Sequence, residues 1–520
     1  MTTATSSPKF MKFAVPFLGF VGAIQGTCPN IASTALVGAS KSLDMAGSTQ
    51  ALAASVQTLA VAASVITTGF LADRFGRRRT LMVALVVGAV GNLIVMAAPT
   101  SAIYMLGMAV TGVGLGAVYS CAFASMKAVV PADRMAGAVG IFTASLMFST
   151  LVMTFIGGAL TSSNWRYGFV LLPAVSMLCL VLTPMIVPTQ VRISGNDADL
   201  PGQALLALGV IAFLYGVSRM GNSLTSPGTL VPLLLGVLLM VGFYLRERSY
   251  PGHFYPVDLL RSPVFLAALA AGFVYTFGTA VLFLQATNLW QYVNGLPTSK
   301  VAVWQLPLLL SGVISALLIG RLMARGMTNR TAAMIGSVLT AAGMVLLGVF
   351  HSSTDLIGFM PGLILGGAGV VVCAVPFGNL ILREAPPDFL GPVTSSRTTF
   401  GQFFYTLGFS LSTVMVDRLT RGGVIGKLTA AGVPANQLSS GIDAVQVYAS
   451  RGTQPSTSFG KEALGDGIAS YGQAFATTMY AAAAAVLVAG LVAMLLLRGG
   501  EGESQPLPEV DPENEATAPA

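Results

Sequence analysis

Long apolar runs dominate the sequence and leave few folds open to it. About fourteen of them are long enough to cross a bilayer as a helix, which takes about 20 residues. They cover roughly residues 13–38, 49–71, 80–98, 102–126, 136–160, 167–188, 202–220, 229–246, 263–292, 301–323, 331–350, 356–382, 394–416 and 472–497. Lipid offers the backbone no hydrogen bonds, so only helices or closed barrels can span it, and runs of this length exclude a barrel. We therefore expect an all-α membrane protein.

The composition agrees with a membrane protein. Of the 520 residues, 54% are hydrophobic and 9% are charged, whereas a soluble chain has about 25% charged residues. The net charge of +7 is spread over loops between the apolar runs rather than gathered on one face. Nucleic-acid binding is therefore not expected.

The sequence contains no catalytic, metal or nucleotide-binding pattern. Its cysteines all lie inside apolar runs without metal-ligand spacing, which favours buried small side chains over disulfides. These are Cys28, Cys121, Cys179 and Cys373. Glycine-rich stretches such as 112–117 and 366–369 lie within predicted spans and indicate close helix contacts. We expect a protein that is not an enzyme and that binds no cofactor and no metal.

Lysine and arginine are distributed unequally between the two sides of the predicted membrane. With the N-terminus inside, eighteen of the 27 basic residues fall on the cytoplasmic side and four fall in short loops opposite, at Lys41, Arg166, Arg219 and Lys300. The other five lie in one long outer loop, where the positive-inside rule weakens. The sequence thus predicts a multi-pass protein of the inner (cytoplasmic) membrane with both termini in the cytoplasm.

The most specific motif is a basic turn between the second and third apolar runs. It reads Gly-Phe-Leu-Ala-Asp-Arg-Phe-Gly-Arg-Arg-Arg-Thr over residues 69–80. It resembles the signature loop G-x-L-x-D-R-x-G-R-R of the major facilitator superfamily. Weaker matches follow in the family's order, including Trp165-Arg166-Tyr167 and Pro256–Arg261. Most of the chain is similar to the 14-span branch known for drug:proton antiporters.

The resemblance implies the major facilitator fold, with two six-helix halves plus two inserted helices. Residues 1–190 would form the first half, 191–250 the insert and 251–500 the second half with an outer loop at 417–471; residues 501–520, which carry six acids and no base, would form a disordered cytoplasmic tail. A short echo between Gly69–Arg74 and Gly320–Arg325 agrees with a duplicated architecture. In such transporters the solute site lies between the halves.

In the family, the signature loop acts as a conformational latch. Its Asp meets a helix end and a neighbouring arginine when the cytoplasmic side is closed. Here Asp73 could cap a helix N-terminus or pair with Arg74 or Arg77. The alternative is that these arginines serve only as topology anchors. The predicted latch consists of Gly69, Leu71, Asp73, Arg74, Gly76, Arg77 and Arg78.

Three signatures of proton-coupled antiport are altered. The first-span acid of D-x-T-x-x-N-x-A is replaced by Gln25, R-x-x-Q-G in span 4 by residues 108–112, and the Gly-Pro pair of span 5 by Met153-Thr154. All acids fall in loops or near span ends, and intramembrane carboxylates are usually functional. This pattern favours weakened or absent proton coupling. The alternative is a relay at an interfacial acid such as Asp44 or Asp355.

Polar residues on otherwise apolar helices are candidates for the solute cavity. They are Gln25, Thr27, Asn30, Gln57, Thr111, Tyr119, Gln285 and Asn288. Neutral hydrogen-bonding groups among apolar side chains suit an amphipathic or uncharged organic solute. The alternative for each residue is a helix-to-helix hydrogen bond. Arg397 could hold an anionic group, but we expect it to extend to the cytoplasmic interface.

These observations predict a secondary active or facilitative transporter that moves a small lipophilic or amphipathic organic solute by alternating access. The resemblance suggests export, as in multidrug efflux. Uptake or exchange of an uncharged metabolite, and a non-transporting membrane receptor on the same fold, remain alternatives. We expect a monomer whose partners are the lipid bilayer and a small organic substrate, with protons left open.

Overall fold

The computed structural model describes residues 8–45, 48–131, 134–189, 199–220, 224–250, 254–296, 298–434, 437–438, 440–441 and 456–499. Its regular elements within these ranges are helices, and no strand occurs there. The acidic segment 501–520, together with Asp133 and Asp197, lies outside the described residues. The predicted all-α fold is confirmed.

The N-terminal half consists of six long helices and one short one. They are α1 (Pro8–Ser42), α2 (Ser48–Phe75), α3 (Arg77–Ala97), α4 (Ser101–Ala124), α5 (Met126–Val129), α6 (Met135–Ser163) and α7 (Leu171–Ile186). A short 3-10 helix, η2 (Trp165–Val170), leads into α7. Tight α3–α4 and α2–α4 packing relies on glycines, because a Cβ at Gly91 or Gly112 would clash with the facing backbone.

Two inserted helices and the C-terminal half follow. The insert is α8 (Leu200–Arg219) and α9 (Pro227–Ser249). The short 3-10 helix η3 (Val257–Arg261) leads from the insert to the C-terminal half. That half consists of α10 (Pro263–Tyr292), α11 (Thr298–Trp304), α12 (Leu306–Ala324), α13 (Asn329–Val349), α14 (Leu356–Glu384), α15 (Leu390–Ala430) and α17 (Ser458–Leu496). The insert packs against both halves, since α8 contacts α2 and α15.

Twelve helices in the described residues are long and apolar enough to cross a membrane. The helices α1 and α15 are not among these twelve, although they run through the same bundle and span 35 and 41 residues. Both carry polar side chains that dilute their hydropathy, including Gln25 and Asn30 in α1 and Arg397 in α15. A bundle of about fourteen helices therefore fits the structure, while the exact number of spans stays a prediction.

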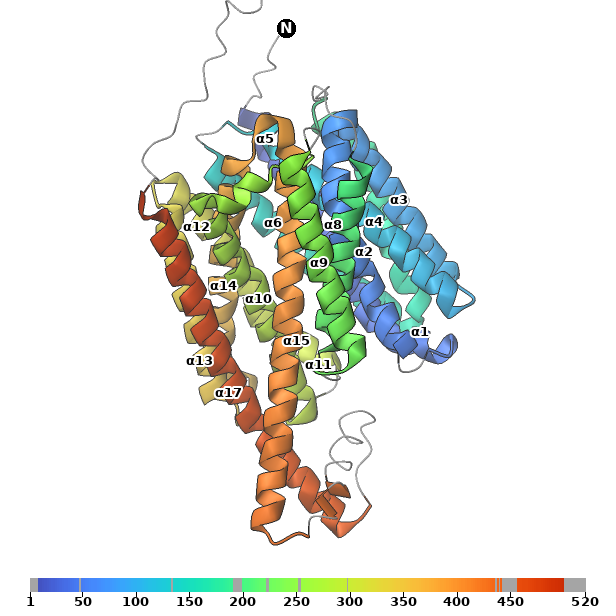
Figure 1. Ribbon diagram of the computed structural model, residues 1–520, viewed down its shortest axis with the longest axis vertical. Coiled ribbons are helices and arrows are strands. Elements are labelled where there is room, and N and C mark those ends of the chain that lie inside the picture. The colour runs from blue at the N-terminus through green and yellow to red at the C-terminus, as the bar shows by residue number, and fades with distance from the viewer. Residues whose placement is uncertain are drawn as a thin grey trace, which may run out of the picture.

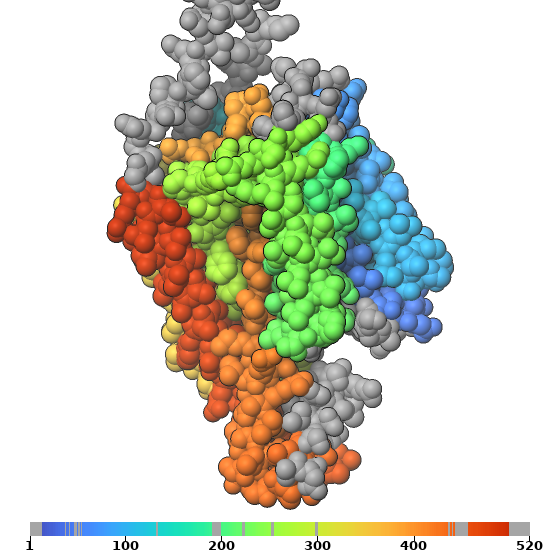
Figure 2. Space-filling view, in the orientation of Figure 1, coloured from blue at the N-terminus to red at the C-terminus, as the bar shows by residue number. Residues whose placement is uncertain are grey.

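The bundle has two distinguishable ends, which Figure 1 shows at top and bottom. We call the upper one the arginine-rich end, because it contains Arg74–Arg79, the α4–α5 corner and the start of α15. The other is the opposite end, beyond which α15 and α17 continue as a protruding pair. The space-filling view shows this pair as a projection below the body (Figure 2).

This projection differs from the predicted outer loop at 417–471. Within it α15 continues to Ala430 and α17 begins at Ser458. Val424, Leu428 and Ala463 form a small buried cluster of their own between the two helices. The apolar run ends near residue 416 because charges such as Asp417 and Arg421 follow, but these form an exposed i,i+4 pair on a continuing helix. Hydropathy marks where lipid contact ends, not where a helix ends.

A buried acidic clasp ties the insert to the segment before α10. The Asp199 carboxylate caps α8 by accepting from the Gly202 N–H at 3.1 Å, and it pairs with Arg246 of α9 at 2.7 Å. Glu247 accepts hydrogen bonds from the backbone N–H groups of Phe254 and Tyr255, both at 3.0 Å. Burial alone would raise the pKa of Asp199, but the hydrogen bonds from Arg246 and Gly202 outweigh it and hold the pKa below its usual range.

We expect the variant Asp199→Ala to destabilise the purified protein at pH 7, by about 1 kcal/mol for the lost helix cap. A carboxyl with a lowered pKa contributes its stability above its unfolded pKa and loses it as the pH falls through the folded value. The difference in melting temperature between variant and wild type should therefore be constant near neutrality and shrink below about pH 4. Thermal unfolding in detergent across pH measures this.

The exposed Asp258, three residues after Tyr255, provides the control. Its replacement by alanine should leave the melting temperature unchanged at every pH. If the melting temperature of Asp199→Ala stayed below that of the wild type by the same amount at low pH, the lowered pKa of Asp199 would be contradicted.

Candidate functional site between the two halves

Two helices from different halves meet backbone to backbone at the arginine-rich end. A Cβ on Gly69 of α2 would lie 2.6 Å from the carbonyl oxygen of Gly391, the second residue of α15. A Cβ on Gly391 would in turn clash with the Gly69 carbonyl oxygen. Any larger side chain at either position would force the helices apart. This contact explains why the sequence has glycine at both places.

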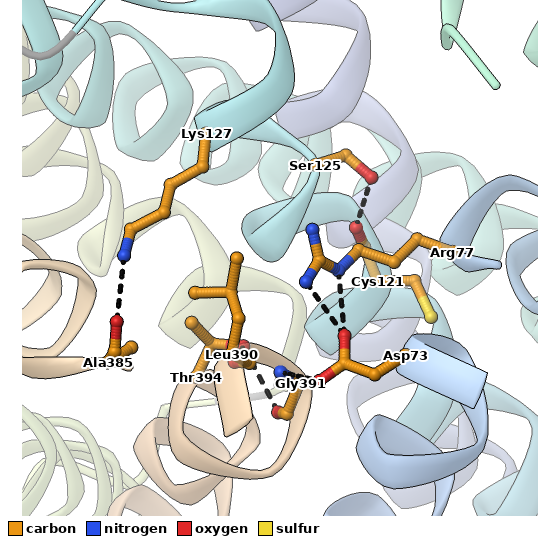
Figure 3. Close-up of polar contacts among 9 residues, drawn as sticks. All are labelled: Asp73, Arg77, Cys121, Ser125, Lys127, Ala385, Leu390, Gly391 and Thr394. Carbon is orange, nitrogen blue, oxygen red and sulfur yellow. Dashed lines mark hydrogen bonds and ion pairs between the residues drawn. The ribbon is translucent and has the colours of Figure 1, made fainter. Parts of the chain in front are cut away.

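Asp73 joins the two halves one turn beyond this contact. One carboxylate oxygen accepts from the backbone N–H of Gly391, which is one of the free donors in the first turn of α15. The other accepts from Arg77 through Nη2 at 2.7 Å and Nε at 3.2 Å. The positive end of the α15 dipole and the guanidinium thus hold one buried carboxylate between them (Figure 3).

Lys127 forms a second clasp on the same corner. Its Nζ donates to the carbonyl oxygen of Ala385 at 3.1 Å, and Ala385 is the C-cap of α14. A cation at a helix C-terminus complements the dipole just as the Asp73 anion does at an N-terminus. The N-terminal half therefore contacts both ends of the α14–α15 turn with charges of the matching sign (Figure 3).

The second half provides an equivalent contact through the echo seen in the sequence. Gly320 of α12 corresponds to Gly69, and it meets Gly140 of α6, whose Cβ would lie 2.5 Å from the Gly320 Cα. In the same register Asp73 corresponds to Ala324 and Arg77 to Thr328. The Ala324 Cβ faces Gly137. One of the two contacts thus has an aspartate one turn after its glycine, and the other has an alanine at the same position.

The remaining predicted latch residues take different places. Gly76 adopts φ of 92°, a conformation that favours glycine, and so permits the tight α2–α3 turn. Leu71 packs at the edge of the apolar cluster that contains Phe70. Arg74 is exposed, whereas Arg78 donates to the Thr189 hydroxyl at 3.1 Å. Of the two predicted partners for Asp73, the structure brings Arg77 rather than Arg74 into contact.

Arg397 lies buried between the halves, so the expectation that it extends to the interface is wrong. It is 7% exposed and sits two turns into α15. Its guanidinium carbon lies 4.9 Å from the Phe123 ring and 5.4 Å from the Tyr119 ring of α4, and 5.2 Å from the Phe377 ring of α14. The side chain points inward because these rings offer it favourable cation–π faces.

Arg397 has few hydrogen-bond partners for a buried guanidinium. Nη2 donates to the Ala374 carbonyl oxygen at 3.3 Å, and buried Nε has no hydrogen-bond partner. In the part of the chain that the structure describes, no carboxylate pairs with it. Cation–π contacts are worth up to about 2 kcal/mol each when desolvated, whereas removing a charge from water costs several kcal/mol. The site is therefore electrostatically incomplete.

The predicted cavity residues of the first half lie mostly among its own helices. Thr27 donates to the Ala23 carbonyl oxygen, and Asn30 donates to Thr154 of α6 at 3.2 Å. Thr111 faces Gly91 of α3, and Gln57 lies at the α2–α4 crossing. Buried side-chain atoms without partners remain at three of these positions, Gln57, Thr111 and Gln25. A lining role for this group stays a prediction.

In the second half, Gln285 donates to Ser412 of α15 at 2.9 Å. Asn288 hydrogen-bonds with Tyr471 of α17. Tyr119 is the predicted residue that the structure brings to the inter-half contact, where its ring covers Arg397 and its hydroxyl is buried without a partner.

The structure also locates the acids considered as proton relays. Asp44 and Asp355 both lie exposed at helix ends. Among the described residues the buried acids are Asp73, Asp199 and Glu247, and all three have the hydrogen-bond partners given above.

Sequence reasoning missed Lys127, Gly391 and the ring residues Phe123 and Phe377 as site residues. No sequence motif marks them. The one available signal was Arg397 itself, a cation three residues into the predicted span at 394–416.

Comparison with known proteins identifies the family. The sequence profile of the Major Facilitator Superfamily matches residues 18–409. The chain belongs to this superfamily. Its membership agrees with the predicted fold of two six-helix halves and makes it a membrane transport protein by family.

Relatives of this facilitator are distant. It is 27% identical over 353 residues to the multidrug resistance protein Stp of Mycobacterium tuberculosis, which is 67% of this chain and 65% of that protein. An uncharacterized transporter of the same species, Rv1877, matches at 26% over 68% of this chain and 52% of its own length. The chain thus spans one half to two thirds of these relatives. The Penicillium oxalicum transporter poxA is 26% identical, over 82% of this chain and 77% of that protein.

Solved structures of other facilitators share its fold. The proton:xylose symporter XylE superposes with a TM-score of 0.58 at 13% identity, covering 92% of this chain and 95% of that one. The human organic anion transporter MFSD10 superposes with a TM-score of 0.59 at 13% sequence identity. The match covers 94% of this chain and 99% of that one. At such identities the likeness extends to the fold alone.

We expect loss of the Asp73 charge to loosen the arginine-rich end. Val393 is buried two residues after Gly391, in the cluster that contains Phe70. In a background with the four native cysteines replaced by alanine, Val393→Cys should react slowly with a membrane-impermeant maleimide. Adding Asp73→Asn should raise the labelling rate about tenfold, the equivalent of about 1.4 kcal/mol, because a charge-assisted contact to α15 is lost.

Arg79 is an exposed arginine of the same turn and provides the matched control. Arg79→Gln should leave the labelling rate unchanged. Equal acceleration by both substitutions would mean that the basic turn acts through its total charge and not through the Asp73 contact.

Proposed function

We propose that this facilitator exports a small lipophilic or amphipathic organic solute by alternating access, in the manner of multidrug efflux. The arginine-rich end would face the cytoplasm, and the conformation described here would be the one closed on that side. The observation that supports this best is the Asp73 carboxylate, which bridges the start of α15 and Arg77 across the two halves.

The chemistry of the closed end suits a reversible contact. The Gly69–Gly391 and Gly140–Gly320 contacts join bare backbone surfaces, so the halves can separate without withdrawing interlocked side chains. The Asp73 and Lys127 clasps end on helix-terminal groups that water can satisfy when they part. Opening at this end therefore exchanges protein hydrogen bonds for water rather than leaving polar groups unpaired.

The placement of acids supports weakened or relocated proton coupling. The buried acids within the described ranges lie at the arginine-rich end, where Asp73 is occupied by α15 and Arg77. Gln25 is a buried amide at the position where the antiporter resemblance would have an acid. A carrier arranged in this way would be driven by its solute gradient. The competing functions are uptake or exchange of an uncharged metabolite, and a membrane receptor that does not transport.

Flux through sealed proteoliposomes tests the proposal. We expect lipophilic fluorescent solutes to cross protein-containing vesicles faster than protein-free ones, at a rate that is unchanged when an imposed pH gradient is collapsed. Loss of flux on collapsing the gradient would contradict the uncoupled mechanism. Absence of flux under both conditions, from protein that melts cooperatively, would favour a receptor.

Asp73→Asn should lower this flux about tenfold while leaving expression and melting temperature near wild type, because one conformation of the cycle loses about 1.4 kcal/mol of stabilisation. Arg79→Gln again serves as the control and should transport normally. Undiminished flux in Asp73→Asn would show that the clasp is structural and takes no part in the cycle.

A further inference from the structure

Arg397 is a buried cation for which the described part of the chain provides no counter-charge. It lies on α15, is covered by rings from three other helices, and has a single hydrogen bond to the Ala374 carbonyl oxygen. A guanidinium presents five N–H donors in a planar fork. An apolar side chain could fill the same space without this deficit. The residue therefore has more binding capacity than its present surroundings use.

A second unpartnered group lies beside it. The ring of Tyr119 covers the guanidinium at 5.4 Å, and its buried hydroxyl has no hydrogen-bond partner. Tyr119 is 7% exposed, as is Arg397. Tyr119 and Arg397 are thus two side chains in contact that each keep an unused donor. A hydroxyl and a guanidinium both suit the same kind of ligand atom, namely an anionic oxygen.

The covering rings are divided between the halves. Tyr119 and Phe123 lie on α4 of the N-terminal half, whereas Arg397 and Phe377 lie on α15 and α14 of the C-terminal half. Phe123 can approach closely because its facing residue on α14 is a glycine, Gly378, whose Cβ would stand 3.1 Å from the Phe123 ring. Separation of the halves would move the α4 rings away from the guanidinium, while Phe377 and Tyr275 of its own half would stay beside it.

The rest of the inter-half contact is also deficient in negative charge. The buried acid that the described residues place there, Asp73, is already shared by Arg77 and the α15 N-terminus. Lys127 ends on a carbonyl oxygen rather than on a carboxylate. A solute that entered between the halves would meet an excess of positive charge.

We propose that Arg397 and Tyr119 form the anion-binding site of this transporter, and that its solute is an amphipathic organic carboxylate. The guanidinium would take the carboxylate in a bidentate pair with the Tyr119 hydroxyl as a third donor, while Phe123 and Phe377 contact the apolar body. The α4 rings cover the cation in the closed conformation. When the halves part, the carboxylate enters between the guanidinium and the α4 rings, so that it has Arg397 on one side and the Tyr119 hydroxyl on the other. This inference deepens the proposed transport function and depends on it.

A matched set of probes separates charge from shape. Dansylglycine is a carboxylate, dansylglycinamide is neutral and dansyl-ethylenediamine is cationic, and all three share one fluorescent apolar body. We expect the wild-type protein in proteoliposomes to transport dansylglycine at least about tenfold faster than the other two, above the rate of protein-free vesicles. In detergent, probe fluorescence should report binding in the same order.

Substitutions then assign the preference to the site. Arg397→Gln should abolish the preference for dansylglycine, so that the three probes behave alike. Arg397→Lys retains the positive charge but loses the planar guanidinium that binds a carboxylate through two hydrogen bonds. It should therefore keep a reduced preference for dansylglycine. Tyr119→Phe, which removes one hydroxyl, should weaken dansylglycine binding several-fold and leave the amide unaffected. It also tests the site if Arg397→Gln does not fold.

Arg421 on the same helix provides the control, because it lies outside the body of the bundle in an exposed pair with Asp417. Arg421→Gln should behave as wild type. Equal handling of the three probes by the wild type, an anion preference that survives Arg397→Gln, or no binding of any probe would each overturn the site. Transport of other lipophilic solutes in those outcomes would leave the proposed function standing, whereas absence of all flux would reject that function as well.

Discussion

The contact between the two halves at the arginine-rich end depends on one carboxylate placed at the start of a helix. Asp73 projects from the last turn of α2 to the first turn of α15, and it can do so only because Gly69 and Gly391 let the two backbones touch. Arg77, on the following helix, shares the same charge. The alignment of α2, the turn at Gly76 and the start of α15 are therefore mutually dependent. A change in any of them would displace the other two.

The two halves of the bundle make this contact in two versions with different physical character. The α2–α15 version combines a glycine contact with the charge of Asp73, whereas the α6–α12 version has a glycine contact with Ala324 at the position of that acid. Charge–dipole interactions are sensitive to solvation and ionic strength, while close backbone packing is not. The two halves of the interface should thus respond differently to the surroundings, and the polar version is the one that ligands or salt can influence.

Much of the architecture followed from hydropathy and one motif, and the remainder depended on contacts between distant residues. The apolar runs located the helices well where loops are short, as at 263–292, which coincides with α10. The apolar runs did not show that α15 continues past residue 416, because the charged residues that follow end the run although the helix goes on. The Asp73–Arg77 pair could be anticipated from spacing, whereas Lys127 and Ala385 are 258 residues apart and no local pattern joins them. Arg397 was misplaced for a related reason: its rings come from α4, α10 and α14.

The unbroken length of α15 has a mechanical consequence. This helix runs for 41 residues from the Asp73 contact through the bundle and out into the projection, a distance of about 60 Å at 1.5 Å per residue. A rigid rod of that length works as a lever, so a tilt of one degree at its start displaces its tip by about 1 Å. The projecting tip therefore amplifies the smallest rocking of the buried end, and anything that grips it from outside would act on the transport cycle with the same leverage.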